Sequence, residues 1–131
     1  MRVLLDTNVL VAAFATRGLC EDVLRTVLAE HDLILGETIF EELERVLATK
    51  LGMPVERARS VAEFLRDQST VVNPSEPAPL PQEDPDDRWI VAAAIEGEVD
   101  ALVTGDRHLL NVADKVSVTI VSPRGFWEKL R

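Results

Sequence analysis

The sequence has one cysteine, no tyrosine and no long apolar run. The single cysteine, Cys20, excludes an internal disulfide. No apolar run is longer than VLVAAFA at residues 9–15, whereas a helix that spans a bilayer needs about 20 apolar residues. The start of the chain also lacks the charged segment and apolar stretch of a signal peptide. We therefore expect a soluble, cytoplasmic protein with no membrane segment.

Basic residues are also scarce, with 14 Lys and Arg against 23 Asp and Glu and a net charge of −9. A protein this acidic repels nucleic acid unless its basic groups are clustered or a bound cation reverses the local charge. Hydrophobic residues, by contrast, make up 47% of the 131 positions, which is enough for one compact core. We expect a single domain over residues 1–131.

Short apolar runs alternate with helical patterns along the chain. Runs typical of strands that are buried on both faces occupy residues 3–5, 33–35, 70–72, 101–103 and 117–121. Helices are predicted over residues 8–15, 20–31, 37–50, 54–68, 84–98 and 107–112, with a further helix after the last strand. This alternation predicts an α/β fold with a parallel sheet covered on both faces. The ligand site of such a sheet lies at the carboxyl ends of its strands.

Two acids follow predicted strands directly. Asp6 comes after the run RVLL, close to the core, where an isolated carboxylate is costly. Asp106 follows ALVTG and repeats this arrangement at a second strand. A simpler explanation for Asp106 is that it caps the next helix, and we expect Thr7 or Asn8 to cap the first one.

Two further acids lie on helix faces that are not fully exposed. Asp87 shares a helical face with Ile90 and Ala94 and should point toward the core. In ETIFEELERVLATK, Glu41 points away from the apolar face, and we expect it to be solvent-exposed without a role in the site. Glu42, by contrast, lies on the border of that face. Taken singly, Asp87 could merely stabilise the start of its helix, and Glu42 could be a solvent-exposed side chain at the edge of the apolar face.

A second pair of acids, Asp84 and Asp86, lies off the apolar face and suits the positive end of the helix dipole.

Together, these positions predict an acidic cluster at the strand ends, formed by Asp6, Glu42, Asp87 and Asp106. Two like charges 4 Å apart repel by about 4 kcal/mol at an effective dielectric constant of 20. Such a group either takes up protons or holds a divalent cation. Hard oxygen ligands without nearby Cys or paired His favour Mg²⁺ or Mn²⁺ over zinc.

The segments LLDTNVL, EEL, DPDDRWIVAAA and LVTGDRHLL occur in an order that resembles the PIN domain family. The similarity is greatest to its VapC-like ribonucleases, the toxin components of bacterial toxin-antitoxin modules, and it covers essentially the whole chain. It implies a three-layer α/β/α sandwich around a parallel sheet. It also implies a metal-dependent endoribonuclease that hydrolyses RNA phosphodiester bonds with Mg²⁺ or Mn²⁺.

The resemblance also assigns site residues and partners. The acidic catalytic and metal-binding positions of the family match Asp6, Glu42, Asp87 and Asp106. Its supporting polar positions match Asn8 and Thr104, and Asp84 and Asp86 have no assured match. Besides the RNA substrate, the resemblance implies a homodimer and an antitoxin protein that blocks the acidic pocket.

The resemblance leaves the contribution of basic and aromatic residues open. Six basic residues could form a positive rim around a metal-neutralised pocket: Arg17, Arg45, Lys50, Arg57, Arg88 and Arg107. Aromatic residues are few, and we expect Trp89, Phe126 and Trp127 to lie in the core or a subunit interface rather than to stack on bases. His108 follows Asp106 closely and could contact substrate, but we expect it to be an ordinary residue at a helix start without such a role.

Two other enzyme classes with acidic strand-end sites do not fit. Haloacid-type phosphatases need a second Asp two residues after the first, where this chain has Asn8. Receiver domains need a lysine after a late strand, where this chain has Ser122, Pro123 and Arg124. The remaining alternative is a catalytically degenerate PIN-like module that binds RNA or protein.

Overall fold

The structure is a computed structural model, and it describes residues 1–80 and 85–130. Within these residues the strands are β1 (Arg2–Leu5), β2 (Asp32–Gly36), β3 (Ser69–Val72), β4 (Ala101–Val103) and β5 (Ile120–Val121). The helices are α1 (Thr7–Ala15), α2 (Leu19–Glu30), α3 (Thr38–Thr49), α4 (Val55–Gln68), α5 (Pro85–Glu96), α6 (Arg107–Asn111) and α7 (Pro123–Lys129), and a 3₁₀ turn covers Ala113–Lys115. The strands form one parallel sheet in the order β3-β2-β1-β4-β5.

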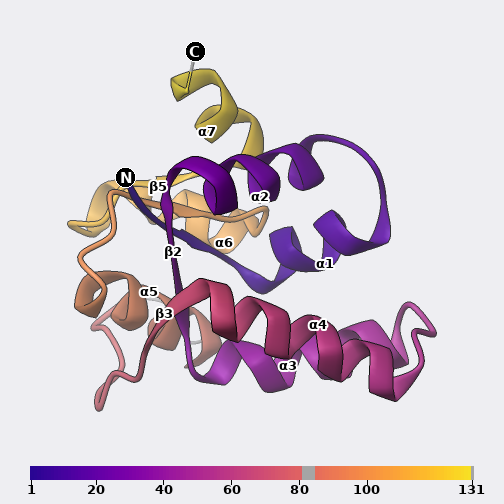
Figure 1. Cartoon of the computed structure of the whole chain (residues 1–131). Coiled ribbons are helices and arrows are strands. Elements are labelled where there is room, and N and C mark those ends of the chain that lie inside the picture. Colours follow the sequence, from indigo (N-terminus) through magenta and orange to yellow (C-terminus); the bar gives the residue numbers. More distant parts are fainter. Residues whose placement is uncertain (81–84, 131) are drawn as a thin grey trace.

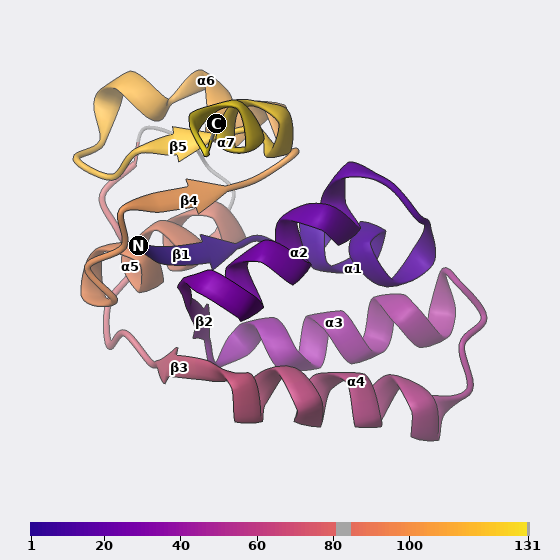
Figure 2. The same ribbon diagram turned by 45° about the horizontal axis from the view of Figure 1, so that its top comes forward.

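Helices cover both faces of this sheet, which confirms the expected three-layer α/β/α sandwich (Figure 1). Helices α2 and α7 pack against each other on one face, and α5 packs against β2 and β4 on the other. Figure 2 shows α3 and α4 side by side, extending beyond the sheet. Parallel strands require such helical crossovers, and the crossovers bury both faces of the sheet. Among the described residues, no helix combines the length and apolar character needed to cross a membrane.

Strand β1 forms the centre of the core. Val3, Leu4 and Leu5 have no exposed surface, because β2 and β4 flank the strand and helices cover it. The register pairs Leu5 with Val103, so the chain leaves β1 and β4 at neighbouring points of the sheet edge. The backbone N–H of Asp6 extends this pairing by donating to the Val103 carbonyl at 2.9 Å. Residues that follow these two strands are therefore brought together.

Two predictions about element ends are wrong. The strand expected over residues 117–121 is reduced to Ile120–Val121, because β5 pairs only with β4 and that strand is itself short. The first helix is capped by Asp6 and not by Thr7 or Asn8. Asp6 has an extended backbone, and its Oδ1 atom accepts a hydrogen bond from the Thr7 backbone N–H at 2.8 Å. The other predicted helices agree with the observed ones to within about two residues.

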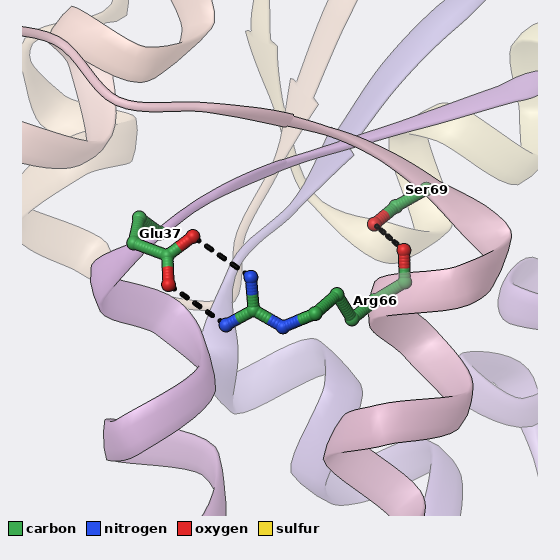
Figure 3. Close-up of polar contacts among 3 residues, drawn as sticks. All are labelled: Glu37, Arg66 and Ser69. Carbon is green, nitrogen blue, oxygen red and sulfur yellow. Dashed lines mark hydrogen bonds and ion pairs between the residues drawn. The ribbon is translucent and has the colours of Figure 1, made fainter.

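An ion pair fastens the end of α4 to the start of α3. Arg66 donates two hydrogen bonds, at 2.8 and 2.9 Å, to the Glu37 carboxylate (Figure 3). Its guanidinium also lies 4.2 Å from the centre of the Phe40 ring. The Ser69 hydroxyl donates to the Arg66 carbonyl at 3.4 Å. Hydrogen bonding to Arg66 lowers the pKa of Glu37. Both charged side chains are open to solvent, so the pair adds little to the stability of the fold.

Candidate active site at the carboxyl edge of the sheet

Asp6 lies in a hydrogen-bond network that joins the ends of β1 and β4. Its Oδ2 atom accepts hydrogen bonds from the Thr104 hydroxyl at 2.7 Å and from the Asn8 side-chain amide at 3.1 Å. Thr104 directly follows β4 and has no exposed surface. The Thr104 hydroxyl also accepts the backbone N–H of Asp106 at 3.0 Å. The network therefore holds the Asp6 carboxylate in one orientation.

Asn8 ties the first turn of α1 to the loop after β4. Its Oδ1 atom accepts the Gly105 backbone N–H at 2.9 Å, while its side-chain amide donates to Asp6. A Cβ atom at position 105 would lie 3.3 Å from this same Asn8 oxygen, so glycine suits the close approach. Both residues expected to be supporting, Asn8 and Thr104, thus contact Asp6 directly.

Asp106 begins the short helix α6. Its carboxylate accepts the backbone N–H of His108 at 2.9 Å, so the capping role that the sequence left open is present. Asp106 also lines the same cavity as Asp6, and its charge raises the pKa of Asp6. Capping does not conflict with a second role, because a carboxylate has two oxygens with several acceptor positions. His108 itself is exposed in the first turn of α6.

Glu42 reaches the same region from α3. Its side chain borders the face that Ile39 and Leu43 bury in the core, as the helical spacing predicted. Its charge interacts with those of Asp6 and Asp86. The acid on the helix border therefore lies close enough to Asp6 for their charges to interact.

Helix α5 brings Asp86 and Asp87 to the site. Asp87 is 4% exposed and shares its inward face with Val91 and Ala94, as expected. Asp86 is exposed in the first turn, which fits the predicted helix start, but it also lines the cavity beside Glu42. Asp84, the other acid considered for this helix start, lies outside the described residues.

Sequence reasoning missed Thr7. This residue is 4% exposed and lines the cavity, and its hydroxyl makes no hydrogen bond of ordinary geometry to the described residues. The hydroxyl is nevertheless close enough to Glu42 to lower the pKa of that carboxyl. A buried hydroxyl without a well-formed hydrogen bond is costly, so a water or a ligand oxygen could bond this atom. Its position next to Asp6 was the only sequence signal.

All four predicted acids line one open cavity of about 890 Å³, whose walls are α1, α3 and α5. Glu41, expected to be solvent-exposed without a role in the site, is exposed but also borders this cavity. Trp89, expected in the core or an interface, is half-buried and lines it too. Of the six basic residues considered for a positive rim, Arg45 and Lys50 are the ones at the cavity.

Burial is the main cause that raises the pKa of Asp6 and the pKa of Glu42 above their ordinary values. The Asp106 charge adds to the rise at Asp6, and the charges of Asp6 and Asp86 add to the rise at Glu42. The hydrogen bond from Thr104 opposes the rise at Asp6 without cancelling it. The carboxylates are thus held in a place that disfavours their charged forms.

These shifts predict how the stability of the metal-free protein depends on pH. The folded pKa values of Asp6 and Glu42 lie above the ordinary 3.8 and 4.5, so the folded chain binds protons more tightly than the unfolded chain. Their contribution to stability is complete below those ordinary values and is lost as pH rises through the raised ones. Urea unfolding in EDTA should show that Asp6→Asn loses less stability than the wild type as the pH rises from below about 4 through the raised pKa of Asp6.

The control for this experiment is Asp32→Asn, at the exposed amino end of β2. This variant should follow the wild-type profile. Parallel stability profiles for the wild type and Asp6→Asn would contradict the prediction.

The donor set of the cavity fits a divalent cation that keeps part of its water shell. Carboxylates and the Thr7 hydroxyl are hard oxygen donors, which Mg²⁺ and Mn²⁺ prefer. Within residues 1–80 and 85–130, no three His, Cys, Asp or Glu side chains form a group that could hold a metal ion on their own. Mg²⁺ usually binds through one or two carboxylates, several waters and substrate phosphates. The unpaired Thr7 hydroxyl could bond one of those waters.

The structure is thus an α/β/α sandwich with a parallel sheet, and acidic side chains line a cavity at the carboxyl edge of that sheet. The chain belongs to the PIN domain family, since the family model for the PIN domain matches residues 2–108. This match contains all four predicted acids and confirms the resemblance seen in the sequence. PIN domains are generally nucleases that use divalent metal ions. No curated protein sequence matched the chain.

Solved structures share the fold at low sequence identity. VapBC2 from Rickettsia felis, bound to a DNA fragment from its promoter, superposes with a TM-score of 0.65 at 13% identity, covering 93% of this chain and 98% of that one. VapBC-1 from nontypeable Haemophilus influenzae gives a TM-score of 0.66 at 17% identity, covering 95% and 99%. The PIN domain endonuclease Utp24 gives 0.57 at 20% identity, covering 92% and 84%.

Proposed function

We infer that this PIN domain is a Mg²⁺- or Mn²⁺-dependent endoribonuclease that hydrolyses RNA phosphodiester bonds in the acidic cavity. One observation carries the inference: Asp6, Glu42, Asp87 and Asp106 come from separate elements and line a single cavity. Neighbouring acid charges add to the rise in the pKa of Asp6 and of Glu42, and such a group either takes up protons or holds a cation. All four residues are present, so the alternative of a degenerate binding module is not favoured.

The roles of the residues follow from how each is held. A divalent ion, when bound, lowers the pKa of a water and stabilises negative charge on the phosphate oxygens. Asp6 is a firmly oriented ligand, because Thr104 and Asn8 donate to its Oδ2 atom. Glu42 is only half-buried and has a raised pKa, so it suits the acceptance of a proton from the attacking water. No Ser, Cys or His nucleophile is required.

The proposal includes a cellular role as the toxin of a toxin-antitoxin module, with an antitoxin protein as partner. The similarity in fold to VapBC2 and VapBC-1 supports this part. The homodimer and the cytoplasmic location implied by the sequence stay predictions.

The test of the activity is cleavage of defined RNAs by the purified chain in Mg²⁺, in Mn²⁺ and in EDTA. Products that form only with a divalent ion would support the nuclease. RNA binding without cleavage under every metal condition would instead favour the degenerate binding module.

Divalent ions should also stabilise the folded chain, because they bind the cavity and not the unfolded state. For a dissociation constant near 1 mM, an ion at about 10 mM adds about 1.4 kcal/mol, or about 5 °C in Tm for a domain of this size. Thermal unfolding should show this rise for the wild type and a smaller one for Asp6→Asn. An equal Tm in MgCl₂ and in NaCl of matched ionic strength would speak against a metal site in the free protein.

A further inference from the structure

The cavity is much larger than a metal site requires. A divalent ion with six waters occupies about 200 Å³, whereas the cavity measures about 890 Å³. The additional space lies between two helix faces. Helix α1 contributes the face from Asn8 through Ala12 to Ala15, and α3 contributes the face from Thr38 to Val46 with Lys50 just after its last turn. We call this space the α1–α3 groove.

The α1–α3 groove changes charge along α3. Glu41 and Glu42 lie near the start of the helix with the other acids, Arg45 follows one turn later, and Lys50 lies at the end. Arg45 already acts on the acidic end, since its charge lowers the pKa of Glu42. Lys50 is about 12 Å further along the helix than Glu42, at 1.5 Å per residue. Among the described lining residues, no acid lies beyond Arg45 in this direction.

The walls of the groove carry apolar groups between these charges. Val11, Ala12 and Val46 line it, and the indole of Trp89 is half-buried on the α5 side. Proteins that bind single strands combine basic groups for the phosphates with apolar or aromatic surfaces for the bases. The groove therefore has the chemistry of a single-stranded nucleic acid path that starts at the acids.

We propose that the α1–α3 groove binds the single-stranded RNA segment on one side of the cleaved bond, with Arg45 and Lys50 contacting its phosphates. The proposal rests on the function inferred above and adds the path of the substrate. The distance of about 12 Å corresponds to three or four nucleotides of a stacked strand, at about 3.4 Å for each. The two basic side chains also explain how a chain of charge −9 can hold RNA.

The first experiment measures binding of a fluorescein-labelled oligouridine of about 12 nucleotides by fluorescence anisotropy. The Asp6→Asn background in Mg²⁺ keeps the strand intact. Lys50→Glu should weaken binding about tenfold and lower the slope of log affinity against log salt by about 0.7, the value for one lost phosphate contact. Arg45→Ala should act in the same direction.

The matched control is Lys115→Glu, which makes the same charge change at an exposed lysine of the 3₁₀ turn, away from the groove. We expect less than about a twofold loss of affinity for it. Equal losses of RNA affinity for Lys50→Glu and Lys115→Glu would overturn the proposal, because the losses would then reflect the change in net charge alone.

A second experiment uses cleavage by the otherwise wild-type chain. Shortening a defined RNA on one side of the cut should raise KM for the wild type but not for Lys50→Ala, and shortening the other side should affect both equally. If no RNA is cleaved but binding still depends on Lys50, the nuclease function is refuted and the groove proposal stands. If RNA is cleaved but KM is the same for the wild type and Lys50→Ala, the nuclease function stands and the groove proposal is refuted.

Discussion

Asp6→Asn is expected to reduce Mg²⁺-dependent RNA cleavage by about a hundredfold or more while the chain stays folded. Asparagine has nearly the same shape, and its single amide oxygen can still accept hydrogen bonds from Thr104 and Asn8, at the loss of the capping bond from the Thr7 backbone N–H. It lacks the negative charge that a divalent ion needs. Initial cleavage rates on one defined RNA, with circular dichroism to verify the fold, would measure the effect.

The control for this loss is Asp32→Asn, the same chemical change at the opposite end of the neighbouring strand β2. Its cleavage rate should equal that of the wild type. Full activity of Asp6→Asn would show either that the cavity is not the catalytic centre or that the activity belongs to a contaminant.

Thr104→Val should lower both stability and activity, because the Thr104 hydroxyl contacts three neighbouring residues. It donates to Asp6, accepts the backbone N–H of Asp106 and lies 3.5 Å from the Asn8 amide. Valine keeps the shape but leaves that partly buried N–H without its acceptor, which should cost about 1 to 2 kcal/mol in the free energy of unfolding. Loss of an orienting contact to a ligand should also slow cleavage about 10- to 100-fold.

The pH dependence of the cleavage rate shows whether Thr104→Val acts through the Asp6 carboxylate or only through a general loss of stability. The hydrogen bond from Thr104 lowers the pKa of Asp6, so its removal should raise that pKa further. The acid limb of the cleavage rate should then move to higher pH in Thr104→Val. Thr104→Ser should restore the wild-type limb, and Thr70→Val, at an exposed position of β3, should change neither property. An unmoved acid limb in Thr104→Val would show that the hydroxyl does not tune Asp6.

The predictable parts of the fold are those that local patterns specify. Strands buried on both faces have continuous apolar runs, and amphipathic helices repeat their apolar residues every three or four positions, so the α/β layout could be inferred. The length of β5 could not, since it depends on how much of β4 is available for pairing. The capping role of Asp6 was missed because one side chain both ends a strand and begins a helix.

The candidate site divides in a similar way. Helical geometry selected Glu42 over Glu41, and strand ends identified Asp6 and Asp106. Thr7 escaped notice because its exceptional property, a buried hydroxyl without a hydrogen bond, depends on what packs around it.

The sequence by itself determined the fold class and the family and proposed the four candidate acids, because periodicity and short motifs are properties of neighbouring residues. Only the tertiary structure decided that these acids share one cavity with Thr7, and that Arg45 and Lys50 are the basic residues beside it. The physical reason is the packing of α1 against α3 at the sheet edge. That packing sets which side chains from distant segments face each other, and no local pattern encodes it.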